Sequence, residues 1–397
     1  MTRKKPPATP AGPQVAPHAA NVIAMPASRT PRVLLSVDRA VSEIRRGRAV
    51  VLLGAEGRAV LVQAAEAVTQ ASLDEARARS GAEPRLAVTR TRARVLGLTP
   101  PPGLAVVRLV VPEPLDANTV MALANPLDDT PPAIEGLGME PAAPHDPATA
   151  AVELAKIARL LPAATVTPLD LPDAEDPMRF AARADLLVVD AGDVFQYDRT
   201  AARTLSAVSE ARVPLGLAEN TRVIAFRPDD GGLEHLAIII GEPNPEEPVL
   251  VRLHSECFTG DLLGSLRCDC GDQLKGAIGE IAAAGAGVLL YLAQEGRGIG
   301  LVNKLRAYQL PDGGFDTMDA NEQLGFDADE RIYLPAVEML KRLGFAAIRL
   351  LTNNPLKVEA LAACGLAVIE RVPHSFPANA HNALYLQTKK AKGGHLF

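Results

Sequence analysis

Residues 252–273 read Arg-Leu-His-Ser-Glu-Cys-Phe-Thr-Gly-Asp-Leu-Leu-Gly-Ser-Leu-Arg-Cys-Asp-Cys-Gly-Asp-Gln. They hold three of the four cysteines in the chain, Cys257, Cys268 and Cys270. Charged side chains flank these cysteines on both sides. Thiolates are good ligands for zinc, and the close pairing of Cys268 with Cys270 favours a shared ion. The stretch therefore predicts a metal centre around which the second half of the chain folds.

Three protein ligands with an open fourth position are typical of a catalytic zinc, which lowers the pKa of a bound water towards about 7. A structural zinc usually has four ligands from two C-x-x-C pairs, and the sequence contains no such pairs. Two other interpretations stay open: a structural zinc completed by a remote ligand, and ordinary buried or redox cysteines. His254 is the nearest rival ligand. On an expected strand, the side chains of His254 and Cys257 point to opposite faces. We therefore predict that His254 lines the pocket.

A glycine-rich segment, Gln294-Glu295-Gly296-Arg297-Gly298-Ile299-Gly300, lies between an expected strand and an expected helix. Glycines let the backbone approach an anion, and amides at a helix N-terminus bind phosphate. The spacing is neither a Walker loop nor a dinucleotide fingerprint. A tight turn with an exposed arginine is therefore the alternative interpretation.

Basic residues near this segment are candidates for binding a triphosphate: Lys304, Arg306, Arg331 and Lys357. Arg306 on a helix is expected to be solvated. Lys357 follows Thr352-Asn353-Asn354-Pro355, a loop that leaves a strand and opens a helix. Residues 327–331, Asp-Ala-Asp-Glu-Arg, form a dense charged cluster that fits a solvated turn equally well.

Residues 252–261 and 266–274 together resemble the signature of GTP cyclohydrolase II, an early enzyme of riboflavin synthesis. The similarity continues through residues 294–300, 329–331, 350–355 and 392–396. It covers roughly residues 221–397, with the motifs in the order of the family. The resemblance implies a zinc-dependent α/β domain that hydrolyses GTP.

The resemblance also implies roles for individual residues. Zinc ligands would be Cys257, Cys268 and Cys270. Asp329 would accept a proton, Tyr308 would lie beside the zinc-bound water, and Arg331 would attack the α-phosphate. Because a guanidinium stays protonated, charge stabilisation by Arg331 is the alternative. Residues of the GTP site would be Arg252, Leu253, His254, Ser255, Glu256, Gln273, Glu295, Gly296, Arg297, Thr317, Thr352 and Lys357.

The implied reaction opens the guanine ring and releases formate and pyrophosphate. Its product is 2,5-diamino-6-ribosylamino-4(3H)-pyrimidinone 5′-phosphate. Mg²⁺ is expected to bridge the phosphates of GTP, and the resemblance implies a homodimer. Two alternatives remain: a paralogue acting on another heterocycle, and a non-catalytic GTP-binding regulatory protein.

Length and composition restrict the class of protein. With 397 residues the chain is expected to hold two domains. The net charge of −6 argues against a nucleic-acid partner. No apolar run reaches the roughly 18 residues of a membrane helix, so no membrane partner is expected. Three cysteines in one site leave Cys364 alone, which argues against disulfides and favours a reducing cytoplasm.

The predicted fold is α/β, with two mixed α/β domains. Residues 1–33 are expected to be a disordered proline-rich tail, 34–216 one domain and 217–397 the cyclohydrolase domain. Proline-rich segments near 126–147 and 168–177 are expected to be surface loops. Expected strands are 49–53, 59–62, 104–111, 186–189, 223–227, 236–241, 249–253, 287–292, 347–352 and 366–371. Expected helices are 36–46, 63–78, 148–161, 274–284, 299–310, 336–343 and 356–363.

Residues 35–215 faintly resemble 3,4-dihydroxy-2-butanone 4-phosphate synthase, without an intact catalytic motif. The acidic loop of that family corresponds to Gly54–Val60, which has one carboxylate. Its His-Thr-Glu corresponds to Pro147-Ala148-Thr149, and a catalytic glutamate to Pro168. A divalent cation needs oxygen ligands, so this domain is predicted to lack synthase activity and to serve as a scaffold or dimer contact.

Overall fold

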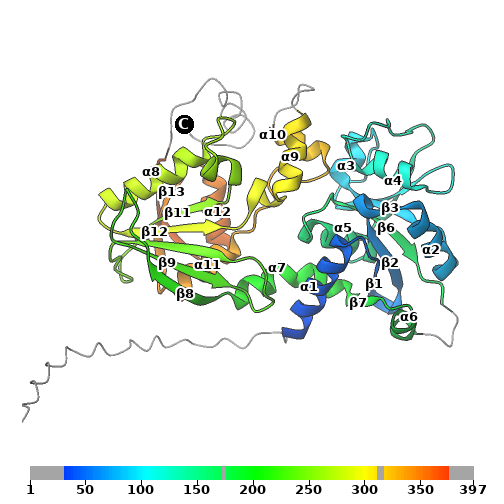
Figure 1. The fold of residues 1–397 in the computed structure, drawn as a ribbon, viewed down its shortest axis with the longest axis horizontal. Helices are drawn as coiled ribbons and strands as arrows, with labels where there is room; N and C mark the ends of the chain where they lie inside the picture. Colours follow the sequence, from blue (N-terminus) through cyan, green and yellow to red (C-terminus); the bar gives the residue numbers. More distant parts are fainter. Residues whose placement is uncertain (1–30, 172–175, 311–316, 375–397) are drawn as a thin grey trace, which may run out of the picture.

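The computed structural model describes residues 31–171, 176–310 and 317–374. They form two α/β domains, each built on a seven-stranded sheet (Figure 1). This confirms the predicted fold class. The expected tail, residues 1–33, lies outside the described residues except for its last three, which begin α1 (Pro31–Arg45). Residues 392–396 also lie outside them. Among the described helices, none has the length and apolar character needed to cross a membrane.

The first sheet has the strand order β5-β4-β3-β6-β2-β1-β7, and only the β1–β7 pair is parallel. Its strands are β1 (Val50–Leu53), β2 (Ala59–Ala64), β3 (Arg85–Thr89), β4 (Val106–Val110), β5 (Gly138–Ala142), β6 (Ala163–Pro168) and β7 (Leu187–Asp190). Its helices are α1, α2 (Gln70–Ser80), α3 (Arg90–Val95), α4 (Ala117–Ala124), α5 (Pro147–Ile157), α6 (Pro177–Arg183) and α7 (Ala191–Thr204).

Helices cover both faces of this sheet. Val50 and Leu52 pack against α1, α5 and α7, whereas Val51 packs against α2 and α6. Neighbouring side chains of a strand point to opposite faces, so a strand buried on both faces needs a continuous apolar run. This is why residues 50–53 were recognisable from the sequence.

The second sheet has the order β14-β13-β11-β12-β10-β9-β8. Its first four strands are mutually parallel and the others antiparallel. The strands are β8 (Ser206–Arg212), β9 (Thr221–Arg227), β10 (His235–Ile240), β11 (Val249–Ser255), β12 (Gly287–Leu292), β13 (Ala347–Leu351) and β14 (Ala367–Val372). Helix α8 (Cys270–Ala283) covers one face, and α11 (Leu334–Arg342) and α12 (Pro355–Ala363) cover the other.

The expected domain boundary at 216–217 falls inside the second sheet, between the paired strands β8 and β9. The expected loop at 126–147 contains β5, which is a correction. Strand β5 lies at the sheet edge and contains Pro141, so it lacks the apolar run that marks the inner strands.

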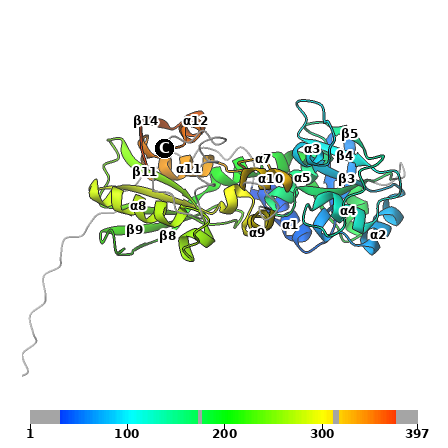
Figure 2. The same cartoon turned by 90° about the horizontal axis from the view of Figure 1, so that it is seen from above.

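Two helices of the second half reach across to the first domain. Helices α9 (Leu301–Gln309) and α10 (Thr317–Gln323) pack on each other, and α10 contacts α3 of the first domain (Figures 1 and 2). Their apolar side chains form a cluster with Leu161, which follows α5. Helix α7 makes a second bridge, because it contacts α11. The two sheets are therefore joined through packed helices as well as through the chain.

Candidate active site

The candidate site lies at the carboxyl ends of the parallel strands β11, β12 and β13. The segments that follow these strands begin at Glu256, Ala293 and Thr352. In open α/β sheets, ligands bind at this edge because loops from neighbouring parallel strands converge there. The fold thus brings together three motifs that are separated in the sequence.

The three cysteines form a compact group. Their sulfur atoms all lie within 4.8 Å of one another, and Cys257 Sγ is 3.7 Å from Cys268 Sγ. No other set of three His, Cys, Asp or Glu side chains in the described residues is arranged in this way. Hydrogen bonds from Cys268 and Cys270, together with the charge of Lys304, lower the pKa of Cys257. The hydrogen bonds with Cys257 raise the pKa values of Cys268 and Cys270, so the thiolate character is concentrated on Cys257, and a thiolate is a good ligand for a soft metal ion.

Gly260 is packed against this group. A Cβ atom placed there would lie 2.9 Å from Cys268 Sγ and 3.0 Å from Cys257 Sγ. Real Cβ contacts are not that short, so any side chain would enter the space between the sulfur atoms. Gly260 belongs to a π-helical turn, Phe258–Leu262, which carries the chain back towards Cys268.

Asp261 holds the first cysteine in place. Its Oδ2 accepts the Cys257 N–H at 3.0 Å and the Tyr291 hydroxyl at 2.9 Å. Both its carboxylate oxygens lie 3.0 Å from His254 Nε2. His254 is therefore a buried partner of Asp261, outside the three-cysteine group, and burial lowers its pKa. Asp261 could not be predicted from the sequence, because a lone aspartate in a polar loop resembles any solvated acid.

A buried ion pair connects the glycine-rich segment to the cysteines. Glu295 Oε1 lies 2.7 Å from Lys304 Nζ, and Glu295 Oε2 accepts the Phe258 N–H at 2.6 Å. Lys304 Nζ also lies 3.1 Å from Cys257 Sγ and 3.0 Å from Thr259 Oγ1. Lys304 was expected to serve the triphosphate. It lies instead at the cysteine centre, where it balances the negative charge of Cys257 and Glu295.

Tyr308 lies on the same side of the centre. Lys304 Nζ is 5.6 Å and the Arg267 guanidinium 5.2 Å from the middle of its ring. Burial raises the pKa of Tyr308, against the opposing influence of Lys304 and Thr259. The hydroxyl therefore stays protonated near neutral pH and can donate a hydrogen bond.

Buried cations lie below the strand ends. Arg252 donates to the Leu351 carbonyl at 2.9 Å and to Gln273 Oε1, and burial lowers its pKa to about 10. Lys357 Nζ reaches the Leu253 carbonyl at 3.4 Å. Thr352 Oγ1 accepts the Asn354 N–H at 3.1 Å. Positive charge is thus concentrated where an anionic ligand would meet the sheet.

Glu256 and Ser255 are only partly buried at the end of β11. Burial and the charge of Glu295 raise the pKa of Glu256. Thr317 is the first residue of α10, and its side chain lies outside the described part of the chain.

The second charged cluster lies beside the glycine-rich turn. Gly296 and Arg297 both have a φ of 63°, a left-handed conformation that is uncommon for arginine. Arg297 donates to the Ala328 carbonyl at 3.2 Å, and its own carbonyl accepts the Glu330 N–H at 3.0 Å. Residues 294–298 and 327–331 are therefore held as one unit.

Asp329 and Arg331 are paired with each other. Arg331 Nε donates to Asp329 Oδ1 at 2.8 Å, and its backbone N–H donates to the same oxygen at 3.1 Å. Burial acts to raise the pKa of Asp329, but these hydrogen bonds and the Arg331 charge lower it overall. Asp329 is thus ionised, and Arg331 is oriented by it.

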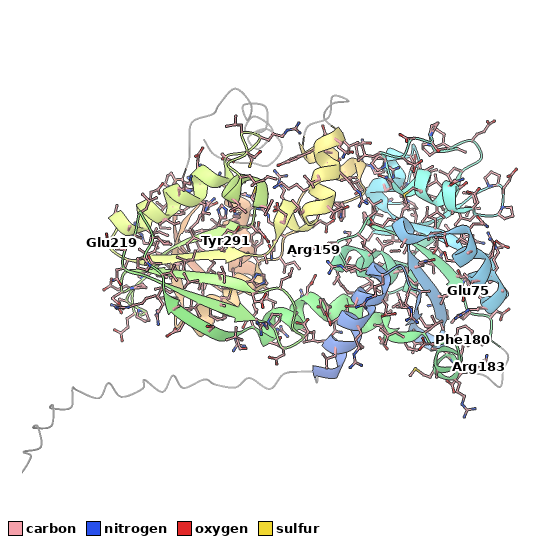
Figure 3. The ribbon with its side chains drawn as sticks, in the orientation of Figure 1. Glu75, Arg159, Phe180, Arg183, Glu219 and Tyr291 are labelled. Carbon is pink, nitrogen blue, oxygen red and sulfur yellow. The ribbon has the colours of Figure 1, made fainter. Side chains whose placement is uncertain are left out.

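The first domain contacts both the glycine-rich segment and the charged cluster directly. Arg159, which Figure 3 shows between the two domains, donates from Nη2 to the Ala293 carbonyl at 2.7 Å. Lys156 Nζ lies 2.8 Å from Glu330 Oε1, between Asp329 and Arg331 in the sequence. Arg306, expected to be solvated, instead pairs with Glu66 of the first domain at 2.9 Å. Sequence motifs could not predict these contacts, because the two residues of each contact are far apart in the chain.

This arrangement places a three-cysteine group that could hold a metal ion beside buried cations at one edge of a mixed α/β sheet. A family model described as GTP cyclohydrolase II matches residues 206–373. A "GTP cyclohydrolase-2" of Azospirillum brasilense is 56% identical over 366 residues, covering 91% of this chain and 94% of the relative. The chain belongs to the GTP cyclohydrolase II family.

Two further proteins are similar to this chain at lower identity. A "Riboflavin biosynthesis protein RibBA" of Bacillus cereus is 44% identical over 252 residues, covering 62% of this chain and 63% of the relative. A solved two-domain 3,4-dihydroxy-2-butanone 4-phosphate synthase of A. baumannii is 18% identical, with a TM-score of 0.36. It covers 85% of this chain and 99% of its own. That score is too low to support an argument.

Proposed function

We propose that the protein hydrolyses GTP to 2,5-diamino-6-ribosylamino-4(3H)-pyrimidinone 5′-phosphate, formate and pyrophosphate, an early step of riboflavin biosynthesis. The observation that carries the proposal is the three-cysteine group at the edge where three parallel strands end. The 56% identity to a "GTP cyclohydrolase-2" over most of both chains supports the same reaction.

Zinc fits the donor set of Cys257, Cys268 and Cys270, because three soft sulfur atoms converge on a space that Gly260 leaves open. When bound, zinc supplies a Lewis acid that makes hydroxide available near neutral pH. The remaining chemistry falls to the side chains of this chain. Mg²⁺ would accompany the triphosphate, since it favours phosphate oxygens.

The chain's own residues have distinct roles in this proposal. Arg252, Thr352 and Lys357 bind the nucleotide at the strand ends, and Glu256 and Gln273 read the guanine edge. Glu295 and Lys304 keep the cysteine loop in position through buried contacts. The protonated Tyr308 hydroxyl donates to the ring-opened formamide, whose hydrolysis releases formate.

Pyrophosphate release involves Arg331 and Asp329. A guanidinium stays protonated in proteins, and here it is bound to an ionised carboxylate. We therefore assign Arg331 to charge stabilisation of the phosphoryl group and Asp329 to orienting it. The geometry gives no reason to prefer the expected nucleophilic role for Arg331.

The proposal extends to the state of the protein in the cell. Reduced cysteines are needed for the metal centre, which favours the cytoplasm. We also propose a homodimer. Four large apolar side chains are exposed within one short segment beside the site, as is common for contact surfaces. They are Phe258, Leu262, Leu263 and Leu266. Sedimentation equilibrium tests the dimer, and a monomer at micromolar concentration would contradict it.

The decisive experiment incubates purified protein with GTP and Mg²⁺ and measures formate, pyrophosphate and the diaminopyrimidine. Cys268→Ser is expected to lose bound zinc and all ring opening. The matched control is Cys364→Ser, because Cys364 is outside the cysteine group and is only partly buried, against the core of the second sheet. Full turnover by metal-depleted protein would contradict the proposal.

A further inference from the structure

A cavity of about 260 Å³ lies between the two domains, apart from the cysteine centre. The first domain contributes residues of α1, α5 and α7 to its walls. The second contributes the turn between β9 and β10 and parts of residues 293–298 and 326–335. The cavity therefore lies where Figure 2 shows α1, α5 and α7 next to the second domain.

The walls carry more acidic than basic groups. The acids are Asp38, Glu153, Asp198, Asp230 and Glu330, and the cations are Arg45, Lys156 and Arg159. All three cations have protein acceptors: Lys156 pairs with Glu330, while Arg45 and Arg159 donate to the backbone. His235 Nδ1 accepts the Ala293 N–H, and burial lowers its pKa to about 4, so it is neutral.

Two buried acceptors in these walls have no hydrogen-bond partner among the described residues, Asp230 Oδ2 and Gln294 Oε1. Asp230 is 7% and Gln294 9% exposed. Gln294 Nε2 donates to the Ile332 carbonyl at 2.7 Å, which fixes the orientation of the amide. Asp230 Oδ1 accepts the Gly232 N–H at 3.0 Å, while the Tyr197 hydroxyl lies beside the same carboxyl group. Leaving a buried acceptor without a hydrogen-bond donor costs free energy. A ligand of this cavity is therefore expected to supply donors to both atoms.

The acids are spread around the cavity. Within the described ranges, only the cysteines place three ligand atoms within 4.8 Å, so the acids do not converge on one metal ion. Burial and mutual repulsion raise the pKa of Asp198 to about 6, and burial raises the pKa values of Asp38 and Glu153. An extended positive ligand would relieve this repulsion at several points at once.

We propose that this cavity binds a small organic cation with several N–H donors, of the size of a guanidino-amine. Its donors would satisfy Asp230 Oδ2 and Gln294 Oε1, and its charge would be balanced by Asp38, Glu153 and Asp198. The ligand would touch both domains and the backbone that leads into the glycine-rich turn. Binding does not depend on the proposed hydrolysis of GTP.

Isothermal titration of the zinc-loaded full chain with agmatine, which carries a guanidinium and an ammonium, tests the proposal. One molecule is expected to bind per chain and to raise the melting temperature. Asp230→Asn and Asp38→Asn, one from each domain, should each weaken binding about tenfold or more, because the first loses a charged hydrogen bond and the second a balancing charge. Asp229→Asn is the matched control, since Asp229 is exposed next to Asp230.

Each other outcome overturns the proposal. Agmatine that does not bind, or that binds both variants as tightly as the parent chain, would show that these acids hold no such ligand. Equal loss in Asp229→Asn would indicate only general electrostatic attraction. Tetramethylammonium, which has the charge but no N–H donor, should bind at least tenfold more weakly. If it binds as well as agmatine, the unpaired acceptors are not the recognition element.

Discussion

Gly260 shows how a single residue without a side chain can shape a candidate metal site. Gly260→Ala places a methyl group between sulfur atoms that are already close, so it should cost about 1–3 kcal/mol of stability. We expect the variant to lose most of its zinc, as measured by metal analysis of the purified protein. GTP turnover should fall with the zinc content.

Gly279→Ala is the control for this change. Gly279 lies in α8, and a Cβ there meets nothing within 4 Å. Alanine is the better helix former, so this variant should keep its zinc and gain up to about 1 kcal/mol of stability. A zinc content in Gly260→Ala equal to that of Gly279→Ala would show that the cysteine group tolerates the methyl.

Substitution of Tyr308 should slow the second hydrolytic step, the release of formate, more than the first, the opening of the guanine ring. Tyr308→Phe keeps the ring between Arg267 and Lys304 but removes the hydroxyl donor. We expect formate release to slow by about 100- to 10,000-fold, so that the ring-opened formamide accumulates. Chromatography of the products measures this directly. Unchanged product ratios at full zinc content would make the tyrosine a packing residue.

At the scale of elements, the end of α5 acts on the active site from the neighbouring domain. Arg159 has a φ of 60°, and its guanidinium holds the carbonyl before Gln294. Arg159→Met should lower kcat/KM for GTP roughly tenfold, because a charged hydrogen bond that positions the turn is lost. Zinc content should not change.

The control for Arg159→Met is Arg48→Met. Arg48 also pairs on the first domain, with Asp185, but at an exposed site away from the second. Steady-state kinetics on both variants make the comparison. Identical rates in Arg159→Met and the parent chain would mean that the turn keeps its shape without this contact.

Helix α7 carries an acid whose burial destabilises the fold at high pH. The pKa of Asp198 is raised from an ordinary 3.8 to about 6, because the side chain is buried near the charges of Glu153, Asp230 and Glu330. Lys156 is a cation that lines the same cavity. An acid whose pKa is raised by folding does not reduce the free energy of unfolding at pH values below its ordinary pKa. The cost grows as the pH rises and is complete above about 6.

Asp198→Asn removes this cost. It should therefore raise the stability at pH 8 by about 1–2 kcal/mol, with a gain that narrows towards pH 5. Thermal denaturation at both pH values measures the gain, with Asp229→Asn as an exposed control. A gain of the same size at pH 5 and pH 8 would not come from titration of Asp198.

At the scale of the whole molecule, the first domain is expected not to make dihydroxybutanone phosphate. The positions that correspond to the synthase motifs do come together. A Cβ on Gly54 would lie 2.5 Å from Pro147, and Pro168 is paired with Val60. The nearby Asp146 is already bonded to Arg108 and to the backbone N–H of Ala148. Oxygen ligands for a divalent cation are thus scarce there.

Ribulose 5-phosphate and Mg²⁺ supplied without GTP should therefore give no formate above the blank. The same preparation must release formate from GTP, which shows that the chain is folded. Robust formate from ribulose 5-phosphate would show that the first domain keeps a catalytic site of its own.

The parts of this molecule that the sequence predicted are those with a local signal. Strand β12 is a nearly continuous buried apolar run, and β11 and β13 each begin with apolar residues, so all three were predicted within a residue or two of their limits. Strand β8 is almost entirely exposed and α7 is mostly polar, so neither gave an apolar pattern. The three cysteines were recognisable because spacing alone marks a thiolate site.

The supporting contacts were not predictable, because they depend on how distant segments meet. Lys304 was predicted to bind the triphosphate, whereas the fold places its Nζ 3.1 Å from Cys257 Sγ. Arg159 lies in a segment with no motif, and only the packing of the domains brings it to Ala293.

The docking of α9 and α10 on the first domain has a consequence for synthesis on the ribosome. Every strand of the first sheet precedes Ser206, so that sheet can be complete before α9 leaves the exit tunnel. Helices α9 and α10 then pack on a surface that is already folded. Leu161 of that surface joins Ala307 and Leu324 in one apolar cluster. The earlier domain thus offers a preformed docking surface to α9 and α10 of the later one.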